Sequence, residues 1–493
     1  MFGKIKIYLV YLICAIFIAL NAYFISKDIY WVLLVPAIML IMLMYFFALD
    51  KLMFIIVFFT PLSINLREID IGVGFALPTE PLMFGIMILF FVKLFFEHKI
   101  NEKIIKHPVT IAILLNLVWI FFTSFTSELP LVSFKYLISR LWFVVTFYFV
   151  AIQLFKNFKN INTFIWMYTI PLIGVIAYTT VVHAQYGFDE QTAHWVMSPF
   201  FNDHTAYGAI LAMFIPLLIG FIIDPLNKKL FKIIAILALS ILLLALVLSY
   251  CRAAWVSLFI AFLVFLVLRL KINYKVVLMT LFTLIAGFLI LQNQIWMKLE
   301  KNKQASSKNF TEHLQSISNI STDASNTERL NRWSSAFRMF DQRPFLGWGP
   351  GTYQFVYAPF QLSKEKTIIS TNTGDKGNAH SEYIGPLAEE GVFGTLTFLG
   401  IIITVIYTSI RTYKRAKQKV VRNTSIVFLI GLITYLVHGF LNNFLDTDKA
   451  SVPFWGFIAI IVVLDVYFKN EPEIIEEDKP LSENSKQSKE VTK

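Results

Sequence analysis

The sequence predicts an all-α fold: a polytopic transmembrane helix bundle of about 12–14 spans with one large, partly helical loop outside the membrane. Three observations predict it. The chain has 493 residues, of which 57% are hydrophobic and only 15% charged. The hydrophobic residues gather in repeated runs long enough to cross a bilayer. One polar stretch, at about 295–380, interrupts these runs. This composition excludes the soluble chain of about three domains that the length alone would suggest.

The apolar runs give about fourteen candidate membrane helices. They lie near 5–25, 29–49, 52–64, 79–97, 107–127, 133–155, 161–184, 205–223, 229–250, 253–270, 275–294, 383–410, 424–443 and 451–468. The segment at 52–64 is the weakest, because it is short and runs into Pro61. It is either a span or a broken, re-entrant helix, which a membrane protein tolerates only where other protein segments bury it.

These helices divide the chain into four parts. The parts are transmembrane helices over 1–294 (about 11 spans), the large loop over 295–382, transmembrane helices over 383–468 (about 3 spans) and a tail over 469–493. The tail is charged and lacks aromatic residues, so we expect it to be disordered.

The basic residues indicate which way the chain crosses the membrane. Lys and Arg gather at every second connection, most strongly at 411–422, and the alternate connections are poor in them or acidic. The positive-inside rule then places both termini in the cytoplasm and the large loop outside, which in a bacterium-like cell is the periplasmic face of the inner membrane. Topology thus accounts for most of the net charge of +11, and no nucleic-acid motif accompanies it, so nucleic acid is not an expected partner.

Neither metal nor nucleotide chemistry is indicated by the sequence. The two cysteines, Cys14 and Cys251, show no metal-ligand spacing, and the carboxylates form no metal motif. A Ser-His-Asp elbow and a nucleotide fingerprint are both absent. We therefore expect no metal and no cofactor.

Within the loop, a helical pattern over 327–341 combines aromatic and basic residues. Trp333, Phe337 and Phe340 form one apolar stripe, and Arg329 and Arg332 lie one turn apart, with Arg338 and Arg343 further on. One interpretation is a helix lying on the membrane, with its arginines at lipid headgroups. The other is a cationic platform for a pyrophosphate, which the planar guanidinium fork suits.

The loop continues into PFLGWGPG at 344–351 and ends at His380. The proline ends the helix, and the glycines, Gly349 among them, allow a tight structural turn or a phosphate-binding backbone. No Lys-Ser/Thr follows, as a nucleotide P-loop would require. His380 is either structural or a general base, because its ordinary pKa suits proton transfer near neutral pH.

Two further arginines are expected on the same side of the membrane. Arg252 begins one apolar run, where it either snorkels to headgroups or binds an anion. Arg140 lies several residues inside the span at 133–155, and a buried intramembrane arginine needs an anionic partner. The remaining outer polar residues are Asn202, Asp203, His204, His438, Asp446 and Asp448.

Three stretches, in order, resemble the O-antigen ligase and O-antigen polymerase family of bacterial membrane glycosyltransferases. SYCRAAWVSLFIAF resembles its Ser-x-Ser-Arg-x-x-Trp element, with Arg252 as the arginine. ERLNRWSSAFRMFDQRPFLGWGPGTY resembles its Arg-x-x-x-Trp helix followed by Pro-x-x-Gly-x-Gly, which makes Arg329 the matching arginine. NAHSEYIGPLAEEGVFG resembles its His-Asn-x-x-Leu…Glu-x-Gly-x-x-Gly element, at His380 and Glu389. The likeness covers about 200–395.

The chain departs from the family pattern at two positions. Cys251 stands where the family often has Ser or another small residue, and Ser381 stands where it often has Asn. Neither departure removes a charge. Arg332 is an alternative to Arg329 as the key loop arginine, because the helix offers both.

The resemblance implies a metal-independent glycosyltransferase that moves a glycan from undecaprenyl diphosphate to a lipid A-core type glycolipid. It implies His380, Arg329 and Arg252 as catalytic residues. The expected substrate-binding residues are Arg332, Arg140, Arg338, Trp333, Gly349 and Glu389. A polysaccharide polymerase or a protein oligosaccharyltransferase with the same donor is the alternative. A transporter of lipid-linked sugars fits less well, because the notable charges gather on one face.

Overall fold

The structure is a computed structural model that describes residues 2–28, 30–66, 75–97, 101–225, 227–273, 275–277, 279–280, 282–283, 286–287, 324–363 and 377–471. The chain forms two compact units, Met1–Ile56 and Val57–Lys493. The first unit contains α1 (Phe2–Ile25), the 3-10 helix η1 (Tyr30–Leu34) and α2 (Val35–Phe47), and α3 (Leu49–Phe59) begins in it.

The second unit is helical except for one pair of short strands in its described residues. Its helices are α4 (Thr79–Glu97), α5 (Glu102–Ile105), α6 (Pro108–Phe125), α7 (Pro130–Val144), the π-helical turn η3 (Val145–Val150), α8 (Ala151–Phe155), α9 (Lys159–Gln185), η4 (Thr192–His194), α10 (His204–Ile223), α11 (Lys229–Leu248), α12 (Arg252–Arg269), α15 (Ala324–Gln342), α16 (Tyr353–Val356), η5 (Ala358–Phe360), α17 (Ile384–Arg415), α18 (Lys419–His438), α19 (Asp448–Val463) and η7 (Leu464–Phe468). The strands β1 (Ile64–Asn65) and β2 (Ala76–Leu77) pair antiparallel.

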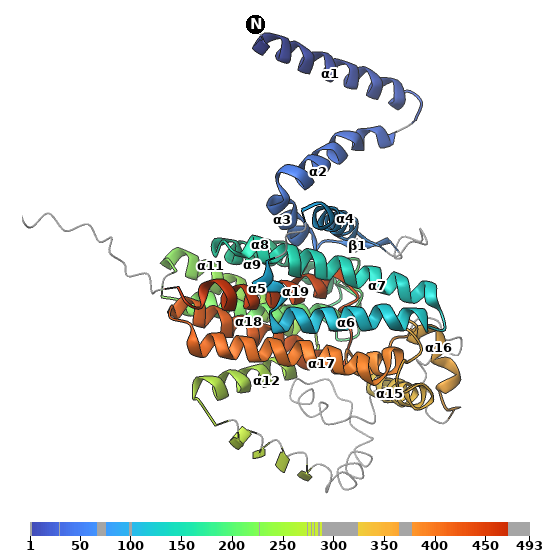
Figure 1. Cartoon of the computed structure of the whole chain (residues 1–493), viewed down its shortest axis with the longest axis vertical. Coiled ribbons are helices and arrows are strands. Elements are labelled where there is room, and N and C mark those ends of the chain that lie inside the picture. The colour runs from blue at the N-terminus through green and yellow to red at the C-terminus, as the bar shows by residue number, and fades with distance from the viewer. Residues whose placement is uncertain are drawn as a thin grey trace, which may run out of the picture. The chain divides into compact units, whose positions relative to one another are not determined.

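Ten helices of the described residues are long and apolar enough to cross a membrane. They are α4, α6, the continuous helix Pro130–Phe155, α9, α10, α11, α12, α17, α18 and the continuous helix Asp448–Phe468. In Figure 1, α6, α7, α17 and α18 run side by side through the bundle. The all-α polytopic fold that the sequence predicts is confirmed.

The two ends of this bundle differ in chemistry. At one end, which we call the Arg329 end, α10, α12, α17 and α19 begin and α18 ends. At the other, the Lys419 end, Arg269, Tyr413 and Lys419 line one groove. The span predicted at 275–294 lies mostly outside the described residues.

The doubtful segment at 52–64 forms a helix that is too short to cross a bilayer. α3 has 11 residues, whereas a spanning helix needs about 20. The chain then turns at Thr60–Ser63 and enters β1. This favours the broken-helix alternative.

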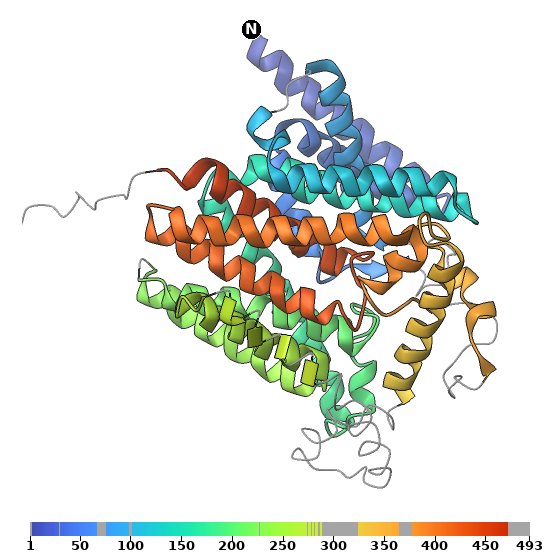
Figure 2. The same ribbon diagram turned by 60° about the horizontal axis from the view of Figure 1, so that its bottom comes forward.

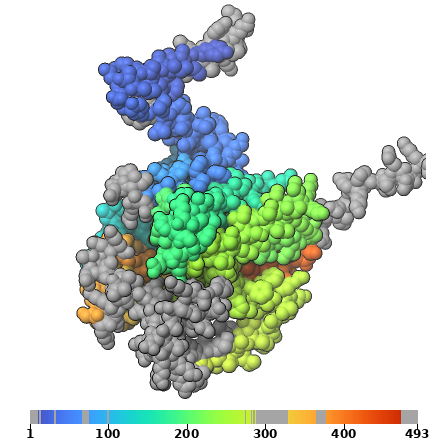
Figure 3. Space-filling model, turned by 180° about the vertical axis from the view of Figure 1, so that it is seen from behind, coloured from blue at the N-terminus to red at the C-terminus, as the bar shows by residue number. Residues whose placement is uncertain are grey.

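α19 lies at the centre of the second unit, and α11 and α12 lie at its edge. In the helix that α19 begins, 83% of the most apolar 18-residue stretch is buried. The corresponding share is 28% for α11 and 17% for α12. Seen from behind, α11 and α12 form much of the outer surface, in green to yellow-green (Figure 3). Their exposed leucine, isoleucine and phenylalanine side chains are suited to contact with lipid.

At the Lys419 end, one buried carboxylate joins three segments. Asp465 accepts hydrogen bonds from Thr412 Oγ1 at 3.0 Å, from Lys469 Nζ at 2.7 Å and from Arg411. His107 Nε2 lies 3.6 Å from the same carboxylate. The cluster therefore ties α17 and the start of α6 to the end of α19.

We expect Asp465→Ala to destabilise the fold by about 3 kcal/mol, because it leaves buried cationic groups without their counter-ion. Arg411 and Lys469 keep some contact with solvent, which moderates the loss. Thermal unfolding of the purified protein in detergent, followed by fluorescence, measures it. Glu471→Ala, at an exposed position nearby, is the matched control. Equal melting temperatures for the two variants would contradict the prediction.

Candidate functional site

α15 carries the loop arginines and lies across the Arg329 end of the bundle rather than along it (Figure 2). The sequence predicted that its Trp333–Phe337–Phe340 stripe would be its apolar face. The structure instead buries Glu328, Arg332, Ala336 and Met339, and Phe337 is 46% exposed. The inner face of α15 is therefore mixed, with Glu328 and Arg332 followed by Ala336 and Met339, and Phe337 of the aromatic stripe points outward.

The structure distinguishes between the two candidate arginines of α15. Arg332 is almost fully buried: its Nε donates to Glu328 Oε1 at 2.8 Å, and its guanidinium lies 4.5 Å from the Tyr357 ring centroid. Arg329 is only half-buried, and its Nε donates to the Leu441 carbonyl at 3.2 Å. Arg329 is therefore the more accessible of the two to an anionic ligand, with Arg332 held behind it by Glu328.

His380 lies beside these arginines, just before α17. Its backbone is in the left-handed region, with φ of 48°, and its N–H donates to Asn378 Oδ1 at 3.1 Å. Burial, followed by the positive charges of Arg329 and Arg332, lowers the pKa of His380 to about 4. The imidazole is thus neutral near pH 7 and able to accept a proton.

The start of α10 and the start of α12 complete this end of the bundle. Asp203 caps α10 by accepting from the Thr205 and Ala206 N–H groups, both at 2.8 Å. His204 stacks on His194 at 4.1 Å, and both Arg252 and Arg329 act on His204 electrostatically. The structure therefore brings the three predicted catalytic residues to one end of the bundle.

Arg252 is the first residue of α12, and its Nη2 lies 3.6 Å from Glu190 Oε1. Cys251, directly before it, is fully buried and packs closely against α10. A Cβ at Gly208 would lie 2.7 Å from Cys251 Cβ, so the two helices cross where both residues are small. Burial raises the pKa of the Cys251 thiol to about 12, so this cysteine is a packing residue.

Arg140 belongs to a separate, inner cluster. Its Nη2 donates to Tyr136 Oη at 2.6 Å, and Glu382 and Glu390 attract it electrostatically. Burial raises the pKa of the Glu382 carboxyl, and its hydrogen bond with Tyr435, at 2.7 Å, opposes that rise. These partners were not predicted from the sequence, although carboxylates at the start of an apolar run were a usable signal.

The glycine-rich stretch at 344–351 packs between α7 and α17. The Gly349 N–H donates to the Glu389 carbonyl at 2.7 Å, and the Glu389 side chain accepts from the Tyr353 N–H at 2.8 Å. With φ of 115°, Gly349 packs so closely that a Cβ there would lie 1.9 Å from Ser127 Oγ. Its N–H is engaged within the protein, which favours the structural turn over a phosphate cradle.

The predicted binding residues Arg338 and Trp333, and Arg343 near them, also make contacts within the protein. Arg338 Nη1 donates to the Phe360 carbonyl at 2.7 Å. Arg343 pairs with Glu128 at 2.9 Å. Trp333 packs edge-on against Phe440, with ring centroids 6.2 Å apart. These contacts position α15 over the bundle.

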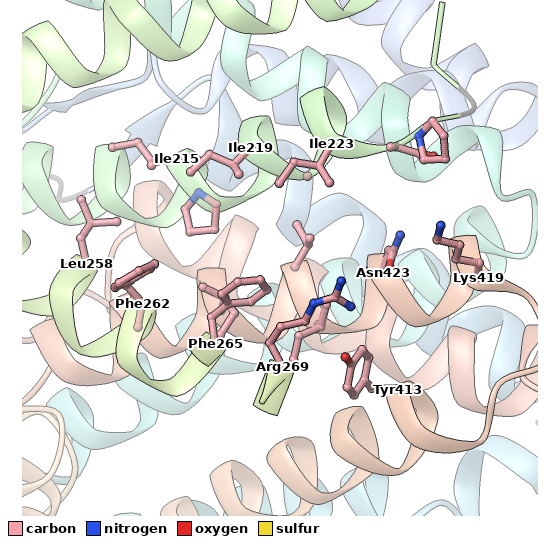
Figure 4. Close-up of a pocket in the computed structure, with 18 residues that line it drawn as sticks. Ile215, Ile219, Ile223, Leu258, Phe262, Phe265, Arg269, Tyr413, Lys419 and Asn423 are labelled. Carbon is pink, nitrogen blue, oxygen red and sulfur yellow. The ribbon is translucent and has the colours of Figure 1, made fainter. Parts of the chain in front are cut away.

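An apolar groove of about 590 Å³ runs between α10, α12 and α18. α10 contributes Ile215, Ile219 and Ile223 along one side, and α12 contributes Leu258 and Phe262 along the other (Figure 4). Leu258 lies six residues beyond Arg252, or about 9 Å at the rise of a helix. The groove therefore begins close beneath the cationic end.

Polar side chains close the other end of this groove. Arg269, Lys419 and Asn423 lie together at the Lys419 end (Figure 4). Within the described residues, no group of three His, Cys, Asp or Glu side chains is placed to hold a metal ion.

Residues 237–399 match the model of a family described as O-antigen ligase. The chain carries an O-antigen ligase domain. The matched segment contains all three motifs, including Arg252, Arg329 and His380, and confirms the family resemblance that they predicted. A search of curated proteins found no match. The protein is thus an integral membrane protein with an O-antigen ligase domain, and its activity is the transfer of glycans by a ligase or polymerase type of enzyme.

Proposed function

We propose that the protein transfers a glycan from undecaprenyl diphosphate to a glycolipid of the lipid A-core type, at the periplasmic face of the bacterial inner membrane. An acceptor hydroxyl oxygen forms the new bond to the anomeric carbon of the donor. The bond from that carbon to the diphosphate oxygen breaks, and its electron pair leaves with the lipid diphosphate. His380 takes the proton of the acceptor hydroxyl.

The observation that carries this proposal is the grouping of Arg329, Arg252 and neutral His380 at one end of the bundle. A diphosphate leaving group gains negative charge in the transition state, and preorganised arginines stabilise that charge where water is scarce. Arg332, anchored by Glu328, adds positive potential behind Arg329.

Binding of the donor would also raise the pKa of His380, the proposed general base. The arginines are among the causes that lower the pKa of His380 in the free protein. A bound diphosphate neutralises them and brings negative charge nearby, so the pKa rises toward a value useful for proton transfer. Donor binding and base strength are therefore coupled.

The apolar groove supports a lipid-linked donor. It begins close beneath Arg252 and extends along α10 and α12 to the Lys419 end. A polyprenyl tail lying there would place its diphosphate at the arginines. Because the donor is itself energy-rich, the reaction requires no nucleotide, and the proposed mechanism uses no metal.

Deletion of the gene tests the function. We expect surface polysaccharide to be lost while long carrier-linked chains accumulate, since a ligase acts on finished chains. Accumulation of single carrier-linked repeat units would favour the polymerase alternative, and a change in glycoprotein alone would favour the oligosaccharyltransferase. If none of these glycan pools changed, the proposed function would be wrong.

A further inference from the structure

A polar cavity of about 350 Å³ lies at the Arg329 end, between β1 and β2, the segment before α10 and the segment before α19. Its volume falls within the range of small-molecule sites, roughly 300–1,000 Å³. Asn378, which accepts the His380 N–H, forms part of its wall, and so does Asp203, which acts electrostatically on His380. The cavity therefore adjoins the proposed base.

The carboxylates of the cavity outnumber its cations. Asp203, Asp446 and Asp448 line it beside the buried Glu80, and Lys449 is the one basic residue among the lining residues described, so the carboxylates outnumber the cations even without Glu80. Such a lining repels phosphate and uronic acid groups and favours neutral or positively charged ligands.

The side chain of Lys449 is hydrogen-bonded within the wall of the cavity. Lys449 Nζ donates to the Thr60 and Ser63 carbonyls, both at 2.7 Å, and is 8% exposed. Asp448 accepts from Ser63 Oγ at 2.5 Å and from Thr79 Oγ1 at 2.6 Å. Lys449 and Asp448 therefore fix the start of α19 against the turn before β1, and the lysine has little capacity to neutralise an acidic ligand.

The remaining lining has the chemistry of a sugar site. Asn65, Asn202, Asn443 and Gln354 present amides, each able to donate and accept, as a sugar hydroxyl requires. Among the residues that the structure describes, the buried Asn443 Oδ1 has no hydrogen-bond partner. Phe200 and Phe444 add apolar surface that the C–H face of a pyranose ring can cover.

We propose that this cavity binds the sugar residue that presents the accepting hydroxyl, and that it selects a neutral or amino sugar over an acidic one. This inference rests on the proposed glycosyl transfer. It assigns the two substrates to opposite sides of His380: the donor diphosphate to the arginines and the acceptor sugar to the carboxylate-lined cavity.

Binding of three monosaccharide probes to the full chain in detergent tests this inference. The probes are methyl glucoside, methyl glucosaminide and methyl glucuronide, followed by saturation-transfer NMR. We expect the first two to bind and the glucuronide to bind at least about tenfold more weakly. Asn443→Ala should weaken binding of the neutral probe by about tenfold, as expected when a buried amide loses its partner. Equal binding of the glucoside and the glucuronide by the unaltered protein would overturn the inference.

A charge reversal provides the second variant. Asp446 is exposed, so Asp446→Lys should preserve the fold, which its melting temperature checks, and it should admit the glucuronide. Unchanged discrimination in this variant would also count against the cavity. Arg329→Ala separates this inference from the function: it should bind all three probes as the unaltered protein does while losing transfer. Sugar binding as described without transfer in any assay would refute the function alone, whereas transfer without discrimination would refute the cavity alone.

Discussion

Arg329→Ala is expected to reduce glycan transfer by about 10²–10³-fold, the loss typical of removing one preorganised charge-stabilising group. The fold should persist, because the Arg329 side chain is only half-buried, and the melting temperature of the variant checks this. Arg329→Lys should recover only part of the activity, since an ammonium lacks the bidentate fork of a guanidinium.

Arg415→Ala is the matched control for Arg329→Ala. Its exposed side chain lies at the far end of α17, at the Lys419 end, and the variant should transfer glycan at the normal rate. Initial rates of acceptor glycosylation with purified variants measure both effects. Arg332→Ala is a less selective test, because it leaves the buried Glu328 without its counter-ion. This variant should also have a lower melting temperature. Normal activity in Arg329→Ala would remove this residue from the mechanism.

His380→Gln is expected to lower transfer by about 10²–10⁴-fold, the contribution of a positioned general base. The free protein holds His380 in its neutral form, since burial and two arginines lower its pKa to about 4. The value of kcat/KM reports the free enzyme, so it should stay level from neutral pH down to about pH 5 and fall as the pH approaches 4.

An ordinary histidine would lose half of its base form at about pH 6.5. A half-loss of kcat/KM near that pH, absent from His380→Gln, would show that the lowered pKa is wrong. The same shift affects stability: the unfolded chain binds this proton more tightly, so stability falls as pH drops below about 6.5. Melting temperatures at each pH separate this loss from the catalytic one.

The helices were largely predictable because bilayer thickness imposes one length and one polarity on every span. The break at Thr60–Ser63 was one of two alternatives that the short apolar run ending in Pro61 left open. The buried face of α15 was not predictable in this way. A periodic pattern assumes that aromatic residues face the protein, whereas beside a membrane Phe337 can face outward while Arg332 is buried.

The positions of Arg252, Arg329 and His380 on one side of the membrane could be expected from topology alone. Their catalytic roles came from the family resemblance and stay a prediction. Their neighbours depended on tertiary packing. The Glu328–Arg332 pair is an exception, because it joins residues four apart on a helix that the sequence predicted. The acidic cavity, in contrast, combines segments almost 390 residues apart, from Ser63 to Lys449. No local sequence pattern predicts that these distant segments lie side by side.

The glycine-rich stretch shows the same limit. Its sequence allowed either a turn or a phosphate-binding backbone, and the choice depended on where its N–H groups point. The Trp348 and Gly349 N–H groups donate to the carbonyls of Ala388 and Glu389, close to the kink that Gly391 introduces into α17 with φ of 72°. The stretch therefore positions α15 relative to the bundle.

The central claim is a transfer that releases the lipid as its diphosphate. The most direct measurement combines the purified protein in lipid nanodiscs with an undecaprenyl-diphosphate-linked glycan and a lipid A-core acceptor, in the presence of a metal chelator. We predict one undecaprenyl diphosphate released for each glycosylated acceptor, and neither product with Arg329→Ala. Release of undecaprenyl monophosphate, or glycosylation that persists at the normal rate in Arg329→Ala, would contradict it.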